Sequence, residues 1–250
     1  VFDEVILNMQ RMNKILAFDE YSGIVTVEAG CILEQLSTYL EGKGFIMPLD
    51  LGAKGSCHVG GNVSTNAGGL RYVRYGSLHG NVLGMEMILP DGTIIDNLST
   101  LRKDNTGYDL KQLFIGAEGT LGVVSKVTIL CPRKPKSVQV AVVGVRSYAD
   151  VLSTMQKCRS DLAEILSAIE FWEHHSLQLV LKQMTHARDP LSNEFPFYML
   201  FETQGSNQEH DFDKLSTFLE QSLETYLIGD GAVAQDTTQA RAFSKLREQI

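Results

Sequence analysis

Hydrophobic and polar positions follow two different periods in the first half of the chain, and these periods predict its elements. Runs rich in β-branched and aromatic residues, bounded by turn residues, predict strands at 1–7, 15–18, 24–27, 82–89 and 123–129. Leu33, Leu36 and Leu40 recur instead at helical spacing. Gly42 and Gly44 follow them, and glycine favours the left-handed conformation that ends helices. The pattern therefore predicts a mainly β-sheet half with one amphipathic helix.

The second half alternates strand and helix patterns. Strands are predicted at 138–145, 164–171, 197–202 and 228–234. Helices are predicted at 148–160 and 174–185, across the apolar face from Phe212 to Leu223, and at 238–250. This order predicts an α+β plait with an antiparallel sheet.

Two prolines among three basic residues at 131–136 predict a linker between the halves. We therefore expect one domain over 1–131, a linker over 132–137 and a second domain over 138–250. The chain begins in a strand-like run and stops within a helical pattern, without a start methionine or a targeting segment. Both ends look cut, which indicates an internal fragment.

Charge and cysteine content exclude several classes of protein. The 22 basic and 30 acidic residues give a net charge of 22 − 30 = −8, which argues against a nucleic-acid partner. No apolar run approaches the roughly 20 residues of a membrane span, so we expect no transmembrane segment. The four cysteines are widely spaced and form no zinc pattern, which predicts reduced, packed thiols.

Residues 51–92 have the most unusual composition, because they contain 10 of the 22 glycines. They match neither the phosphate-binding loop of ATPases nor the glycine turn of nicotinamide dehydrogenases. Paired glycines expose backbone N–H groups that can bind a phosphate or lie against a flat cofactor. A set of tight turns explains the same composition, so the residue types alone leave both interpretations open.

Spaced motifs through this region resemble a known family. They are PLDxG at 48–52, GGNxxTNAGG at 60–69, RYG at 74–76, VLGxE at 82–86 and LPDG at 89–92. Together they resemble the FAD-binding domain of the vanillyl-alcohol-oxidase type, also called the PCMH type. The stretches KDNTGYDL at 103–110 and FIGAEGTLG at 114–122 are similar to those of its D-2-hydroxyacid dehydrogenases. The resemblance runs over essentially all 250 residues, and it implies a PCMH-type FAD-binding domain followed by part of a ferredoxin-like substrate (cap) domain.

The resemblance also implies which residues contact FAD. It assigns to the flavin Pro48, Gly52, Ser56, Gly60, Gly61, Asn62, Thr65, Asn66, Gly69, Gly76, Glu118, Gly122 and Val123. It assigns the substrate carboxylate to Arg247, because a guanidinium can pair bidentately with a carboxylate. Ser244 departs from the family, which often has tryptophan at that position. A solvated helix arginine is the alternative.

Other expected parts of the active site are not found in the chain. The resemblance places the catalytic base and the ligands of a divalent metal, expected to be zinc, beyond Ile250. His58 and His79 are interpreted as structural, His174 and His175 as surface residues of a helix, and His186 and His210 as loop residues. Arg71 and Arg74 could serve the flavin diphosphate, a substrate acid or only the surface.

The implied activity is FAD-dependent oxidation of D-2-hydroxyglutarate to 2-oxoglutarate by hydride transfer to flavin N5. D-lactate or another D-2-hydroxy acid is the alternative substrate, and a flavin-free binding module is the alternative of another class. The resemblance further implies an electron-transfer flavoprotein as electron acceptor and a mitochondrial matrix location. We expect the 250-residue piece alone to be inactive.

Overall fold

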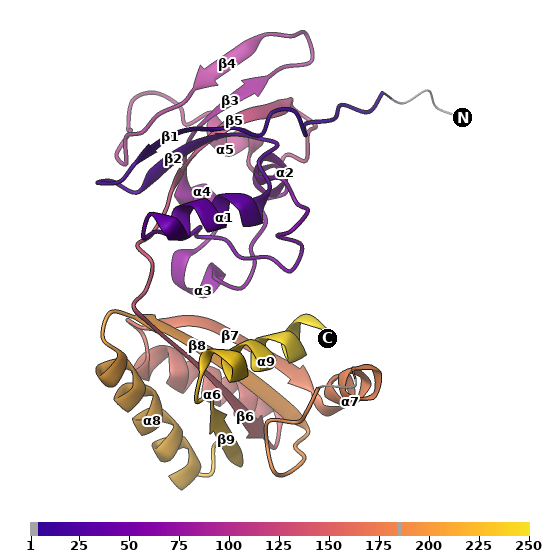
Figure 1. Cartoon of the computed structure of the whole chain (residues 1–250), viewed down its shortest axis with the longest axis vertical. Helices are drawn as coiled ribbons and strands as arrows, with labels where there is room; N and C mark the ends of the chain where they lie inside the picture. Colours follow the sequence, from indigo (N-terminus) through magenta and orange to yellow (C-terminus); the bar gives the residue numbers. More distant parts are fainter. Residues whose placement is uncertain (1–4, 185–186) are drawn as a thin grey trace. The chain divides into compact units, whose positions relative to one another are not determined.

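The computed structural model describes residues 5–184 and 187–250, and its contacts divide the chain into two compact units, Val1–Lys134 and Pro135–Ile250 (Figure 1). The first unit is built on a five-stranded antiparallel sheet in the order β1-β2-β5-β3-β4. Its strands are β1 (Ile15–Asp19), β2 (Ile24–Glu28), β3 (Val82–Ile88), β4 (Ile94–Asn97) and β5 (Val123–Leu130). The last strand in sequence thus lies in the middle of the sheet.

The described part of the first unit also contains five helices. They are α1 (Leu33–Gly42), α2 (Val59–Ser64), α3 (Tyr72–Tyr75), α4 (Leu78–Asn81) and α5 (Lys111–Phe114). The predicted stripe of Leu33, Leu36 and Leu40 is fully buried and belongs to the same core as Val25 and Val27 of β2. Helix α2 packs on β5, so the loop that leads into β5 lies beside α2. This arrangement positions the candidate site.

The second unit contains a four-stranded antiparallel sheet in the order β7-β8-β6-β9. Its strands are β6 (Ser137–Val145), β7 (Leu166–Glu173), β8 (Phe197–Gly205) and β9 (Asp230–Val233), and its helices are α6 (Tyr148–Asp161), α7 (His174–Gln183), α8 (Gln208–Glu224) and α9 (Thr237–Glu248). Apolar residues of α6 and α8 pack in one cluster and those of α7 and α9 in another, so the two helix pairs cover opposite faces of the sheet. The predicted α+β class and antiparallel plait are confirmed.

Residues of the predicted linker are attached at both of its ends. The amide of Lys134 donates to Gly44 O at 2.9 Å, and its ammonium lies 2.9 Å from Glu41 Oε2. The amide of Lys136 instead donates to Gly205 O at 3.0 Å, and Ser137 already begins β6. Little free chain therefore separates the last residue held by the first unit from the first residue held by the second.

Two local predictions were wrong. Residues 5–7 form no strand, because these apolar side chains are exposed and no strand pairs with their backbone, while residues 1–4 lie outside the described part. His210 is not in a loop but in the first turn of α8, where Asn207 Oδ1 accepts from the amides of Glu209 and His210. His186 lies outside the described residues.

Candidate functional site

A pocket of about 380 Å³ opens in the first unit between α2, the turn after β2 and the loop that leads into β5. Its volume lies in the usual range of small-molecule sites. Its lining residues are Met9, Ala29, His58, Gly60, Gly61, Ser64, Thr65, Glu118, Gly119, Gly122, Val123 and Val124. Six of the predicted flavin contacts are among them: Gly60, Gly61, Thr65, Glu118, Gly122 and Val123. The structure thus brings together two segments that are more than 50 residues apart in the sequence.

Backbone hydrogen bonds hold the two walls of the pocket together. The amide of Gly116 donates to Val63 O at 3.1 Å, and the amide of Glu118 donates to Ser64 O at 2.8 Å. On the other side of α2, the amide of Gly60 donates to Ala29 O at 2.7 Å. These bonds use carbonyls of α2 and of the turn after β2, so the pocket wall is preformed by main-chain contacts.

The glycines of the pocket are required for different reasons. A Cβ on Gly60 would lie 2.4 Å from Ala29 Cβ, and one on Gly122 would lie 2.6 Å from Ile88 O, so packing explains both. A Cβ on Gly61 would meet no atom within 4 Å, and the backbone of Gly61 is helical. Packing within the described structure therefore gives no reason for glycine at Gly61, whereas the approach of a ligand to the backbone would.

Two non-glycine residues at this site have left-handed backbones. Asn66 has φ 48° and Glu118 has φ 51°, and together with Tyr226 they are the three such residues in the described part of the chain. Conformations of this kind cost of order 1–3 kcal/mol and gather at functional sites. The Oδ1 atom of Asn66 is also buried without a hydrogen-bond partner. A strained asparagine with an unused acceptor fits a group that donates a hydrogen bond to it.

The other predicted flavin contacts do not line this pocket. Asn62 and Asn66 lie on or just after α2, but Asn62 is buried and its Oδ1 accepts from Cys57 Sγ at 3.6 Å. Gly69 has φ 75°, and a Cβ there would lie 2.2 Å from Asp50 O. The rest are Pro48, which is buried, and Gly52, Ser56 and Gly76, which are exposed.

The pocket also contains residues that the resemblance did not assign. His58 directly precedes α2, and Gly119 has φ 77° with open space at its Cβ position. Gly119 lies in the segment from Glu118 to Val123, which the resemblance already assigns to the cofactor, although Gly119 is not among the individual residues it names. Met9 and Ala29 had no such signal, since they come from the segment before β1 and the turn after β2.

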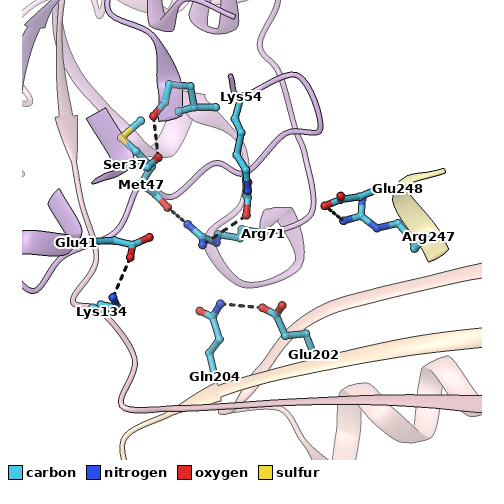
Figure 2. A network of polar contacts seen from close by, with 12 residues as sticks. Ser37, Glu41, Met47, Lys54, Arg71, Lys134, Glu202, Gln204, Arg247 and Glu248 are labelled. Atoms are coloured by element: carbon cyan, nitrogen blue, oxygen red, sulfur yellow. Dashed lines mark hydrogen bonds and ion pairs between the residues drawn. The ribbon is translucent and has the colours of Figure 1, made fainter. Parts of the chain in front are cut away.

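Arg71 is tied into the first unit. Its Nη1 donates to Met47 O at 2.7 Å, and its Nη2 lies 3.6 Å from Asp50 Oδ2 (Figure 2). Asp50 also accepts from Lys54 Nζ at 3.1 Å. These contacts anchor the start of α3 to the 47–54 segment. The contacts of Arg71 therefore support a structural tie, which was not among the three alternatives given for it. His79, interpreted as structural, contacts Gln112.

Arg247 lies in the last turn of α9, in the second unit. Its Nε is 2.8 Å from Glu170 Oε2 on β7. Its Nη2 is 3.6 Å from Glu248 Oε1 (Figure 2). Its side chain is only 22% exposed, so it is not the freely solvated helix arginine of the alternative interpretation. The hydroxyl of Ser244 donates within α9 to Ala240 O at 3.1 Å.

Cysteines and metal ligands complete the inventory of reactive groups. All four cysteines are free, as predicted, and burial raises the pKa of Cys131 and of Cys158 to about 12. Over residues 5–184 and 187–250, no three His, Cys, Asp or Glu side chains gather closely enough to hold a metal ion. Within the same ranges, no helix is long and apolar enough to cross a membrane.

Known proteins match the chain over its whole length. It is 58% identical over 250 residues to the mitochondrial D-2-hydroxyglutarate dehydrogenase of Danio rerio, covering 100% of this chain and 46% of that protein. It is 56% identical over 250 residues to a putative mitochondrial D-lactate dehydrogenase of Schizosaccharomyces pombe, covering 100% and 47%. The chain thus spans about half the length of the curated relatives it matches.

A solved structure shows the fold. Substrate-bound p-cresol methylhydroxylase superposes with a TM-score of 0.69 at 18% identity, covering 95% of this chain and 51% of that one. The fold is therefore of the PCMH type, as the motifs predicted.

Two family descriptions match separate parts of the chain. Residues 1–97 match the FAD binding domain, and residues 134–250 match the C-terminal domain of FAD linked oxidases. Helix α2 and the pocket residues from Met9 to Thr65 lie in the first range, whereas the pocket residues from Glu118 to Val124 lie between the two ranges. Arg247 lies in the second range. Most of the chain thus matches two domain families, the FAD binding domain in its first part and the C-terminal domain of FAD linked oxidases in its second.

Proposed function

We propose that the full-length protein carrying this chain uses FAD to oxidise D-2-hydroxyglutarate to 2-oxoglutarate. The observation that carries the proposal is the 58% identity over all 250 residues to a protein named for that dehydrogenation. The pocket of α2 supports it, because its open glycine, Gly61, suits the close approach of a flavin. Asn66, which follows α2 but does not line the pocket, adds a strained residue with an unused acceptor.

Flavin binding is the proposed task of the first domain. We place that domain at 1–131, the linker at 132–137 and the first part of the substrate (cap) domain at 138–250. The thirteen predicted contacts are proposed to surround FAD. Six of them line the pocket beside α2. Bound FAD supplies an electron acceptor, with N5 receiving the hydride from the substrate carbon; the protein binds, orients and excludes water.

Substrate binding is the proposed task of Arg247. Its guanidinium can hold a carboxylate of the substrate through two parallel hydrogen bonds. The base that takes the hydroxyl proton and the ligands of a divalent metal, proposed to be zinc, belong to parts of the full-length protein beyond Ile250. A general base must lie within hydrogen-bond reach of that hydroxyl.

Oxidation of D-lactate is the second candidate, because a relative that is 56% identical is named as a putative D-lactate dehydrogenase. We propose a mitochondrial location from the names of both relatives, and specifically the matrix. We further propose an electron-transfer flavoprotein as the acceptor of the electrons.

Substrate bleaching tests the proposal. The purified full-length protein is expected to be yellow, and anaerobic D-2-hydroxyglutarate should remove its absorbance near 450 nm while D-lactate should not. Bleaching by D-lactate alone would show that D-lactate, and not D-2-hydroxyglutarate, is the substrate. A colourless protein that takes up no added FAD would instead favour the flavin-free binding module.

Asn66 offers a sharper test of the flavin pocket. Asn66→Gly is expected to leave the melting temperature of the flavin-free protein unchanged or raised, because glycine adopts φ 48° without strain. FAD affinity should fall about tenfold, since one amide hydrogen bond is worth roughly 0.5–1.5 kcal/mol. Asn66→Ala is the matched control and should also lower the melting temperature. Unchanged FAD affinity in Asn66→Gly, measured by flavin titration, would remove the side chain from the site.

A further inference from the structure

Glu170 occupies an unusual place for a carboxylate. It lies on β7 between Ala168 and Trp172, which point to the same face of the strand and are both buried. This face packs against α9. A charged group on a buried strand face costs free energy unless it is paired. The partner of Glu170 therefore has to be identified.

The partner of Glu170 is Arg247. Glu170 Oε2 lies 2.8 Å from Arg247 Nε, and the two side chains are 30% and 22% exposed. The N–H of Nε is not aimed at the carboxylate, because neither atom counts as hydrogen-bonded. The contact is therefore a close ion pair rather than a hydrogen bond. Glu170 makes this ion pair at Nε of the guanidinium.

The opposite edge of Arg247 is free of tight partners in the described part of the chain. Its closest contact there is Nη2 to Glu248 Oε1 at 3.6 Å, which is longer than a hydrogen bond. An arginine held at Nε presents its two Nη groups side by side, in the geometry that binds both oxygens of one carboxylate.

The charges around Glu170 show that this residue does not help to attract an anionic substrate. Burial raises the pKa of Glu170, the Arg247 guanidinium lowers it, and Glu248 and Glu202 raise it further. Glu170 thus faces one guanidinium and two other carboxylates. Glu170 adds negative charge beside a proposed anion site, so its benefit must be geometric.

We infer that Glu170 is a positioning residue, which holds Arg247 at Nε so that the Nη1–Nη2 edge faces the substrate carboxylate. This inference rests on the proposed function of Arg247. Glu170 itself touches no reacting atom. Losing it frees the guanidinium to rotate, which weakens substrate binding and leaves the chemical step almost unchanged.

Glu170→Gln in the full-length enzyme tests the inference, with D-2-hydroxyglutarate as substrate. We expect KM to rise about tenfold and kcat to change less than twofold. Glu173→Gln is the matched control, because Glu173 lies on the same strand but is exposed, and KM should stay within twofold. An unchanged KM in Glu170→Gln overturns the inference, and so does a lowered KM, which would make Glu170 a competitor of the substrate.

The pH profile gives a readout that a merely structural role would not move. Glu170 is ionised above its raised pKa, so the ion pair is present at higher pH and is lost as pH falls through that pKa. The KM of the wild type should rise over that window, where Glu202, Glu248 and Arg247 face the same group. In Glu170→Gln this rise should disappear, and its persistence would count against the inference.

Arg247→Met separates the two levels of the argument. If Arg247→Met leaves KM unchanged, the proposed substrate arginine is wrong whatever Glu170 does. If it raises KM while Glu170→Gln does not, only the positioning role is wrong. The double variant should match Arg247→Met alone, because Glu170 acts through Arg247. Should Glu170→Gln fail to fold, Glu170→Asp decides: an intermediate KM supports positioning, and a wild-type KM overturns it.

Discussion

Gly61→Leu is expected to abolish FAD binding by the full-length protein without unfolding it. The Cβ position of Gly61 meets no atom within 4 Å and lies on the wall of the pocket, so a leucine side chain would fill space proposed for the flavin. Replacing a helical glycine also lowers the entropy of the unfolded chain, which favours stability by roughly 0.4–1 kcal/mol. We expect less than about a tenth of the wild-type flavin content, measured from the visible spectrum.

The neighbouring glycine provides the matched control. A Cβ on Gly60 would lie 2.4 Å from Ala29 Cβ and 3.0 Å from Ala29 O, so even alanine forces the backbone of α2 away from the turn. Overpacking of this kind costs about 1–3 kcal/mol. Gly60→Ala should therefore lower the melting temperature of the flavin-free protein, whereas Gly61→Leu should not. Wild-type flavin content in Gly61→Leu would show that the flavin does not bind in this pocket.

These two glycines illustrate how much of the site could be predicted from the sequence. The motif GGNxxTNAGG pointed to both, but it could not tell them apart, because the sequence does not reveal that Ala29 lies against only one of them. The glycines also hid the helix: residues 59–64 form α2, although glycine disfavours helices and periodicity gave no signal there. Packing on β5 overrides that preference.

Elements with a strong period were predicted well. The helix at Leu33–Gly42 and the strands from β6 onward were found near their observed positions, because each buries a continuous apolar stripe or face. The run at 5–7 has the same composition without a partner strand, and it remains irregular. Composition thus predicts what can form a strand, whereas hydrogen-bond partners far along the chain decide whether it does.

The contact of Arg247 with Glu170 was beyond the reach of the sequence. The two residues are 77 positions apart, and Glu170 is one of 30 acidic residues. Arg247 Nε and Glu170 Oε2 lie 2.8 Å apart because of the register of β7 in its sheet and the packing of α9 against that sheet. Because Arg247 has this partner and is also the proposed substrate arginine, we expect its replacement to have the largest effect on catalysis.

Arg247→Lys in the full-length enzyme is expected to lower kcat/KM for D-2-hydroxyglutarate about 100-fold. Lysine keeps the positive charge but replaces a planar fork by a single ammonium, so it cannot pair with both oxygens of a carboxylate. It also lacks the Nε atom that lies 2.8 Å from Glu170 Oε2, so the close ion pair is not reproduced. A 100-fold loss corresponds to about 2.8 kcal/mol. Truncating one partner of a buried, hydrogen-bonded charge pair costs about 2–5 kcal/mol, and the proposed pair here is Arg247 with the substrate carboxylate.

Arg241→Lys is the matched control, because Arg241 lies on the same helix and is exposed. Its kcat/KM should stay within twofold of the wild type, and both variants should keep wild-type flavin content, since α9 belongs to the second unit. Steady-state kinetics with an artificial electron acceptor measures the difference. Equal kcat/KM in the two variants would return Arg247 to the role of a structural ion pair, whereas a loss in Arg247→Lys alone ties α9 to the substrate carboxylate.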